Sequence, residues 1–251
     1  MIACIWGAKG GTAKTSSAIN LAAALANPRR RVLLIDFDPQ ATATKGLGLE
    51  PANGFLGVLL GEARAADRVQ PVQGLPGLDL LPGSPDLAGA ERRLANETGA
   101  ERLLAVALAP LVRRYSVVLI DTGPGVNVLS VAALAAADLH LAPIMPQPYA
   151  VGSLPDTLAV AGRVRERLNR RLGQTRIALC AVTRSRVVRD TVEGLRQRFG
   201  RQVTRAEIPS SAIMLTAAAR RVPVVTLRPD SPASLAYRAL ARELFAARNL
   251  R

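Results

Sequence analysis

Short apolar, β-branched runs alternate with longer amphipathic stretches along most of the chain. The runs have the length of β-strands and cover Ile2–Trp6, Val32–Ile35, Leu78–Leu81, Val117–Ile120, Leu139–Ile144, Ile177–Val182 and Val222–Leu227. The stretches have the length of helices and cover Thr15–Ala26, Pro85–Ala109, Asn127–Ala136, Ser153–Leu172, Val187–Phe199 and Ser234–Ala247. This alternation predicts an α/β fold, namely a doubly wound, mostly parallel sheet with helices on both faces. Because no repeat or linker interrupts the pattern, we expect residues 1–251 to form a single domain.

A glycine-rich segment with two lysines follows the first predicted strand and opens the first predicted helix. It reads Trp6-Gly7-Ala8-Lys9-Gly10-Gly11-Thr12-Ala13-Lys14-Thr15-Ser16. Consecutive glycines let backbone N–H groups turn toward a phosphate, and the helix N-terminus adds the positive end of its dipole. In this context Lys14 is expected to contact the β- and γ-phosphates of ATP, and the Thr15 hydroxyl to ligate Mg²⁺. Alanines stand at both glycine positions of the strict P-loop pattern, Ala8 and Ala13.

Lysine usage singles out the same loop. The chain has 33 basic residues, of which only Lys9, Lys14 and Lys45 are lysines. A chain that uses arginine almost everywhere else is expected to place lysine where a compact ammonium group is required, because guanidinium is larger and planar.

Three aspartates follow predicted strands at positions suited to a metal–phosphate site. Asp121 ends a buried apolar strand, where an unpaired charge is costly, so a hydrated Mg²⁺ is a natural partner for its carboxylate. Asp36 and Asp38 lie two residues apart at the end of another strand. Both side chains can therefore face the same side of the sheet, near the phosphates.

The loop resembles the deviant Walker A motif of the ParA/MinD group, with Lys9 at the position of the signature lysine and Lys14 at that of the ordinary one. Residues 32–40 resemble the switch I segment of that group, and residues 117–125 resemble its Walker B strand and switch II. Proline-containing segments at 142–148 and 208–224 fall in the same order and spacing. The chain as a whole is similar to the ParA family of DNA-partitioning ATPases.

The resemblance implies a role for each of these residues. The ATP-binding set is Lys9, Gly10, Gly11, Thr12, Ala13, Lys14, Thr15 and Ser16, with Ile208-Pro209 beside the adenine. Mg²⁺ would be held by Thr15, Asp36 and Asp121, and Asp38 would orient the attacking water. The resemblance also implies an ATP-bound homodimer in which Lys9 reaches the ATP of the other subunit, much as an arginine finger does.

The net charge of +14 is concentrated in the C-terminal part of the chain. Residues 1–150 carry 13 basic and 12 acidic side chains, whereas residues 151–251 carry 20 and 7. This asymmetry indicates a polyanionic partner, and the resemblance implies double-stranded DNA bound without sequence preference. The candidate contacts are Arg184, Arg186, Arg189, Arg196, Arg198, Arg201, Arg220 and Arg221.

Two observations place the protein in the cytoplasm, associated with the nucleoid. No apolar run reaches the roughly 20 residues of a membrane span, and the first strand begins directly after Met1. The start also leaves no room for the helix-turn-helix of longer ParA relatives, and a ParB-like activator is the expected protein partner. Cys4 and Cys180 lie in apolar runs and are interpreted as reduced core residues.

Three alternatives remain at this point. A MinD-like ATPase would act in cell division at a membrane surface, which needs an amphipathic helix beyond the fold, but only Asn249, Leu250 and Arg251 follow the last predicted helix and Arg248. A reductase like the nitrogenase iron protein needs cysteines near switch II to hold a cluster. A scaffold that does not hydrolyse ATP would not need Lys14, Thr15, Asp38 and Asp121 together.

Overall fold

The computed structural model describes residues 1–94, 97–147 and 151–246, and its centre is one eight-stranded sheet. The strands are β1 (Ile2–Ile5), β2 (Val32–Phe37), β3 (Gln70–Pro71), β4 (Leu78–Leu81), β5 (Val117–Thr122), β6 (Leu139–Ile144), β7 (Arg176–Val182) and β8 (Val203–Pro209). Their order is β3-β4-β2-β5-β1-β6-β7-β8, and β3 alone pairs antiparallel. The predicted mostly parallel sheet is confirmed.

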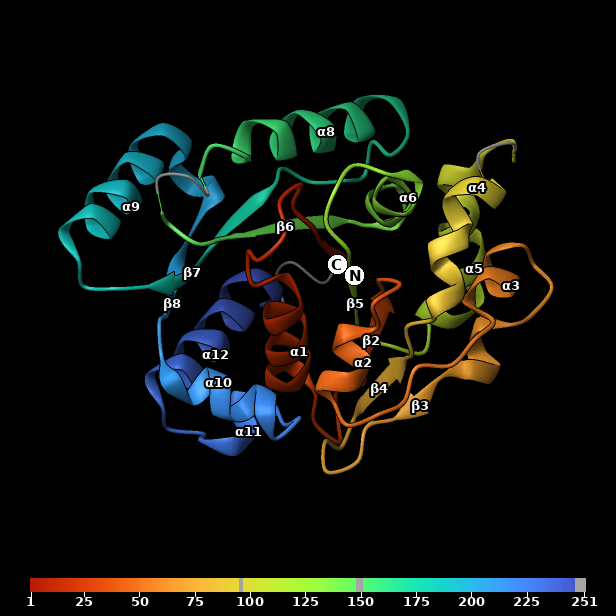
Figure 1. The fold of residues 1–251 in the computed structure, drawn as a ribbon, viewed down its shortest axis with the longest axis horizontal. Helices are drawn as coiled ribbons and strands as arrows, with labels where there is room; N and C mark the ends of the chain where they lie inside the picture. Colours follow the sequence, from red (N-terminus) through yellow and green to blue (C-terminus); the bar gives the residue numbers. More distant parts are fainter. Residues whose placement is uncertain (95–96, 148–150, 247–251) are drawn as a thin grey trace.

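Helices cover both faces of the sheet, as predicted (Figure 1). One face carries α1 (Lys14–Leu25), α2 (Thr42–Gly46), α10 (Ala212–Ala219), α11 (Val224–Leu227) and α12 (Pro232–Phe245). The other carries α3 (Phe55–Leu59), α4 (Ala90–Leu94), α5 (Leu103–Val112), α6 (Val128–Ala136), α8 (Leu154–Arg167) and α9 (Arg186–Phe199).

The two faces follow from the alternation of side chains along each strand. On β1, Ala3 and Ile5 pack into the core beneath α1 and α12, whereas Cys4 and Trp6 pack into the core on the opposite face. Each of these side chains is essentially buried. Because both faces are covered, the central strands are apolar on both sides and appear in the sequence as continuous apolar runs.

One predicted strand is wrong and two strands were missed. Val222–Leu227 was predicted as a strand from its β-branched residues, but it contains the short helix α11. The reason is tertiary: the Val224 N–H donates to Asn20 Oδ1 at 2.7 Å, and Val224 and Val225 are buried against the core. The missed strands lie at the two edges of the sheet: β3 has only two residues, and β8 carries the charged side chains of Arg205 and Glu207.

The predicted helix over Pro85–Ala109 is also wrong, because it is divided. Its first part is a 3-10 turn followed by α4, which ends at Leu94, and its second part is a 3-10 turn followed by α5. Gly99 precedes the second part with φ of 75°, a left-handed conformation that glycine takes without steric cost. The short helices α2, α3 and α10 were not predicted, and residue 247 of the last predicted helix lies outside the described residues.

His140 on β6 is a fully buried polar residue that ties three strands together. Its Nε2 donates to the carbonyl of Trp6 at 3.2 Å, so Nδ1 is the acceptor for the Thr175 hydroxyl at 2.9 Å. The neutral ring therefore has both of its hydrogen bonds. Burial lowers the pKa of His140 to about 4.

We therefore predict that His140 makes the free energy of unfolding fall on acidification. Its pKa is about 4 in the folded protein and about 6.5 in the unfolded chain. Between these values the unfolded state binds more protons, so the contribution is complete above about pH 6.5 and is reduced by roughly 2 kcal/mol at pH 5. Urea unfolding at pH 7 and pH 5 should show a smaller difference for His140→Gln than for the wild type. Equal differences would contradict this role.

Candidate nucleotide-binding site

A cavity opens at the carboxyl ends of the parallel strands, among the loops that follow them. It is lined by the start of α1, by the ends of β7 and β8 and by α10, and its lining includes Gly10, Gly11, Thr12, Ala13, Lys14, Thr15, Ser16, Asp38 and Pro209. Of the residues predicted to bind ATP or to orient water, all but Lys9 therefore lie around one cavity. Lys9 is exposed at the same loop. This edge of a parallel sheet is where ligands bind in α/β proteins.

The loop between β1 and α1 has the turn that a phosphate site requires. Gly11 has φ of 72° and Ala13 has φ of 66°, both in the left-handed region. For Ala13 this conformation costs about 1–2 kcal/mol. The sequence departs from the usual glycine at this position, yet the backbone keeps the conformation that glycine favours.

Lys14 is folded back into its own loop. Its Nζ donates to the carbonyl of Lys9 at 3.0 Å, and the residue is only 7% exposed. Burial lowers the pKa of Lys14, and the charges of Asp121 and Asp38 oppose the shift only in part. The ammonium thus lies between the loop carbonyl and two carboxylates, where phosphate oxygens can replace the carbonyl as acceptors.

Asp36 and Asp121 are fully buried neighbours beneath the loop. They are paired in register on β2 and β5, and neither lines the open cavity. Burial raises the pKa of Asp121 well above its usual range, the charge of Asp36 adds to this, and the Thr15 hydroxyl opposes it. Neither carboxylate oxygen of Asp121 has a hydrogen bond of normal geometry within the described part of the chain, and Asp36 Oδ1 also lacks one.

These buried oxygens fit a divalent cation. Buried polar atoms without partners are rare in proteins, and a hydrated Mg²⁺ commonly takes one or two carboxylates together with phosphate oxygens. Asp36 offers one oxygen, because its Oδ2 already accepts the N–H and the hydroxyl of Thr44 at 2.7 and 2.6 Å. Burial raises the pKa of Asp36 to about 6, although both bonds from Thr44 lower it. Thr44 was not predicted to take part, and nothing in the local sequence marks it.

Asp38 lies against the segment that follows β5. It is 8% exposed, and its Oδ1 accepts the N–H of Gln40 at 2.9 Å. A Cβ added to Gly123 would lie 3.3 Å from Asp38 Cγ and Oδ2, so only glycine leaves this carboxylate undisturbed. Asp38 therefore lines the cavity beside Thr122 and Pro124.

The far end of the cavity is apolar, and sequence reasoning missed most of it. Besides Pro209, its lining includes Met145, Cys180, Met214 and Tyr237. These residues come from four elements or loops far apart in the sequence, so no local pattern could have grouped them. A flat aromatic base suits such a surface, because apolar side chains can pack on its faces.

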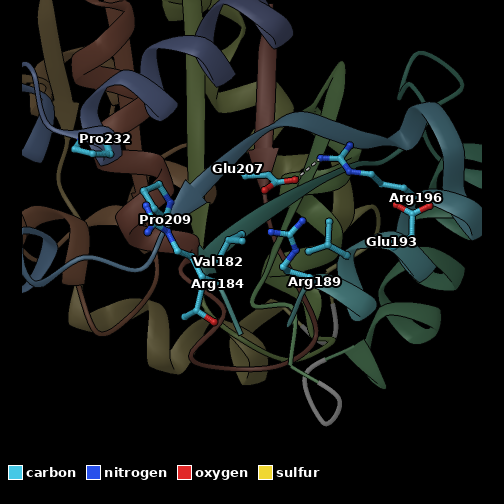
Figure 2. A pocket seen from close by; sticks show the side chains of 10 residues that line it. Val182, Arg184, Arg189, Glu193, Arg196, Glu207, Pro209 and Pro232 are labelled. Carbon is cyan, nitrogen blue, oxygen red and sulfur yellow. Dashed lines mark hydrogen bonds and ion pairs between the residues drawn. The ribbon is translucent and has the colours of Figure 1, made fainter. Parts of the chain in front are cut away.

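The arginines predicted to contact DNA lie at two places. Arg184 and Arg189 line a groove of about 550 Å³ beside Arg196, Glu193 and Glu207 (Figure 2). Arg196 forms an ion pair with Glu207 at 2.7 Å, and Arg186 forms a weak one with Asp190 at 3.8 Å. The other place is the end of α10, where Arg220 is exposed and Arg221 lines a separate cavity with Lys45. Within the described residues, Arg184, Arg189 and Arg220 form no ion pair.

Sequence comparison finds the same family that the loop suggested. A family model described as an AAA domain matches residues 1–174. The chain is 35% identical to a chromosome partitioning protein ParA of Myxococcus xanthus, with 97% of this chain and 87% of the relative covered. It is 38% identical to the chromosome-partitioning ATPase Soj of Thermus thermophilus, with 95% and 92% covered. The chain belongs to the ParA family. It is thus a P-loop ATPase related to chromosome-partitioning proteins.

Solved structures support the fold of this ParA-family chain. A cobyrinic acid a,c-diamide synthase of Mycobacterium smegmatis, with a bound ATP analogue and magnesium, has a TM-score of 0.82 at 29% identity, with 96% of this chain and 92% of that one covered. The cell division ATPase MinD of Pyrococcus furiosus has a TM-score of 0.77 at 26% identity, with 96% and 97% covered. The curated ParA relatives are more similar in sequence than this MinD, which favours the partition class over the MinD-like alternative.

The remaining expectations on cysteines and membranes can be compared with the structure. Cys4 and Cys180 are both free and buried, on β1 and β7, which confirms that they are core residues. Neither lies in residues 122–125, where the reductase alternative would need one. No helix among the described residues is long and apolar enough to span a bilayer. Residues 247–251, on which the MinD-like alternative depended, lie outside the described part.

We predict that Gly123→Ala lowers kcat roughly tenfold while the affinity for ATP changes less than about twofold, because a few tenths of an ångström of displacement at a reacting group is costly. The three atoms nearest to the added methyl would all belong to the Asp38 carboxylate. Steady-state ATPase assays and calorimetry measure the two quantities.

Gly162→Ala on α8 is the matched control, because its methyl would meet no atom within 4 Å. It should leave kcat unchanged and stabilise the helix by up to about 1 kcal/mol. A Gly123→Ala variant with normal turnover would show that Asp38 has room to move or does not act on the water.

Proposed function

We propose that this chain is an ATP-switched partition ATPase, with residues 1–251 as one ATPase domain. The observation that carries the proposal is the buried pair Asp36 and Asp121, whose free oxygens lie beneath a P-loop that holds Lys14 and Thr15. A site built only for stability would not bury such oxygens without partners. A bound nucleotide and cation would supply the missing partners of these oxygens.

The chain's own residues would divide the work as follows. Residues 9–16 would hold the phosphates through backbone N–H groups and Lys14, and the Ile208-Pro209 segment would pack beside the adenine. Thr15, Asp36 and Asp121 would hold Mg²⁺, which neutralises charge on the phosphates when bound. Asp38 would orient the water that attacks the γ-phosphate, because it alone of the three carboxylates reaches the cavity.

Dimerisation would be the output of nucleotide binding. The relevant residue is Lys9, which is exposed at the P-loop and does not line the cavity of its own subunit. A lysine in that position suits contact with the ATP of a second subunit. ATP would then bind the dimer more tightly than the monomer, which is the differential affinity that a switch requires.

The proposed DNA surface rests on charge and on the availability of arginines. Arg184 and Arg189 are exposed and form no ion pair within the described residues, so their guanidinium groups can accept phosphates without breaking one. Arg196 is committed to Glu207, which makes it a weaker candidate. A dimer would present two such surfaces, and a ParB-like activator would trigger hydrolysis and release.

The nucleotide site is tested by Lys14→Ala. The loss of a charged hydrogen-bond donor to the phosphates is worth about 1.5–3 kcal/mol, so ATP should bind roughly 10- to 100-fold more weakly by calorimetry. Lys45→Ala is the matched control, because Lys45 is an exposed lysine that donates to the carbonyl of Gln40 and does not line the nucleotide cavity. Unchanged affinity in Lys14→Ala would remove this lysine from the site.

The switch is tested by DNA binding. Two unrelated duplexes should bind with similar affinity, and binding should need a slowly hydrolysed ATP analogue rather than ADP. A plot of log affinity against log salt concentration should fall with a slope of about 0.9 per phosphate contacted. Lys9→Ala should still bind nucleotide but should neither dimerise nor bind DNA. Equal binding with ADP and with the analogue would contradict the switch.

Paired arginine variants locate the DNA surface. Arg184→Ala with Arg189→Ala, and Arg220→Ala with Arg221→Ala, should each reduce the salt slope. The control variant, Arg170→Ala with Arg171→Ala, removes the same charge from an exposed pair beyond α8 and should leave the salt slope unchanged. If only the Arg170→Ala/Arg171→Ala variant has a reduced salt slope, the DNA-binding surface lies beyond α8 instead. Pelleting with anionic liposomes and the ATP analogue, without any response to duplex, would instead support the MinD-like alternative.

A further inference from the structure

Gly125 is held to the entry of the P-loop by both of its backbone polar groups. The indole Nε1–H of Trp6 donates to the Gly125 carbonyl at 3.0 Å. The Gly125 N–H in turn donates to the carbonyl of Ala8 at 3.0 Å. Trp6 is fully buried and is the one tryptophan in the sequence. Nothing in the proposed binding of ATP uses this side chain.

Trp6 is itself fixed from the side of the sheet away from the cavity. Its ring lies against that of His140, with centroids 5.7 Å apart and planes tilted by 38°. The Trp6 carbonyl accepts from His140 Nε2, and His140 is anchored by Thr175. The indole is therefore a rigid donor, because its ring cannot change rotamer without disrupting this packing.

The segment that Trp6 holds lies directly against the reacting side of the site. Thr122 is anchored by its hydroxyl, which donates to the carbonyl of Ile5 at 2.9 Å. Gly123 backs onto the Asp38 carboxylate, and Pro124 lies 3.8 Å from the position that a Gly10 Cβ would take. Residues 122–125 are therefore fixed at one end by Thr122 and at the other by Trp6, with Asp38 packed between.

We propose that Trp6 is a positioning residue for ATP hydrolysis, which holds residues 122–125 so that Gly123 keeps Asp38 in place. The same hydrogen bond makes the indole a sensor of the nucleotide state, because any movement of Gly125 changes the acceptor of Nε1–H. This inference rests on the proposed role of Asp38. It assigns to Trp6 no contact with ATP or Mg²⁺.

The first test is Trp6→Phe, which keeps an aromatic ring against His140 and removes the donor. We expect kcat to fall about fivefold, the factor that corresponds to one hydrogen bond of about 1 kcal/mol. KM for ATP and the affinity for MgADP should change less than about twofold, because Trp6 does not line the cavity proposed to bind the nucleotide. Turnover equal to that of the wild type would overturn the proposal.

A control separates this effect from a loss of packing. Leu108 belongs to the same buried cluster as Trp6 but lies on α5, away from residues 122–125. Leu108→Val should lower stability in urea to a similar degree and leave kcat unchanged. If both variants lose turnover in proportion to stability, Trp6 has a packing role only and the proposal fails.

The second test needs no variant of Trp6. Because the chain has one tryptophan, a ¹⁵N-labelled sample gives one indole N–H resonance. It should exchange slowly with solvent, and it should shift when an ATP analogue with Mg²⁺ replaces MgADP. An indole resonance that is the same with both nucleotides would overturn the sensing role, and one that exchanges at once would show that the bond to Gly125 is absent in solution.

Asp38→Ala distinguishes failure of this inference from failure of the proposed function. If Asp38→Ala hydrolyses ATP normally, the proposed role of Asp38 is wrong and the positioning role of Trp6 falls with it. If Asp38→Ala loses turnover while Trp6→Phe keeps it, the proposed function stands and the inference about Trp6 alone is wrong. If Asp38→Ala and Trp6→Phe both lose turnover while their affinity for ADP is unchanged, the proposed function and the role of Trp6 are both supported.

Discussion

The structure is organised around two buried carboxylates placed side by side. Asp36 and Asp121 are in register on adjacent parallel strands and are shielded from water. Burial raises the pKa of both carboxylates, and the charge of Asp36 raises the pKa of Asp121 further, so the pair is best satisfied by a bound cation. Neighbouring groups stabilise the two charges in part, since Thr44 donates two hydrogen bonds to Asp36 and the Lys14 ammonium lies close to Asp121. A bound cation would satisfy the oxygens that remain.

The same constraint explains why so many loops are tied to the sheet near these residues. The P-loop is held at Ala8, whose N–H donates to the Thr157 hydroxyl on α8 at 3.1 Å. The segment after β5 is held by Thr122 and Trp6, and the segment after β2 by Thr44. The three threonines lie on α8, β5 and α2, and Trp6 directly follows β1. The charged groups are thus fixed before any ligand binds, which reduces the reorganisation needed during hydrolysis.

What the sequence could predict depended on whether the responsible contacts are local. The P-loop, Asp38 and the strand ends were predictable, because glycine spacing, a helix start and a buried apolar run are all features of neighbouring residues. Val222–Leu227 was assigned wrongly because Asn20, about 200 positions away, converts a β-branched run into a helix. Tyr237 and Cys180 line the cavity only because α12 and β7 bring them there. Such residues carry no local signal, and only the topology of the sheet brings them together.

Electrostatics also limits what the basic C-terminal part can do in a monomer. Several of its arginines already face carboxylates, as Arg196 faces Glu207 and Arg176 faces Glu243 at 2.5 Å. The attraction available to an external polyanion is therefore somewhat smaller than the formal charge, and only those arginines that lie on one face can contact the same duplex. A few phosphate contacts give weak binding at physiological salt. In the proposed dimer, two subunits would double the contacts on one duplex, and affinity would then rise steeply, because the second set is gained without a second association step. A weak surface on each monomer is thus what a dimerisation switch needs, since a strong one would hold DNA in either nucleotide state.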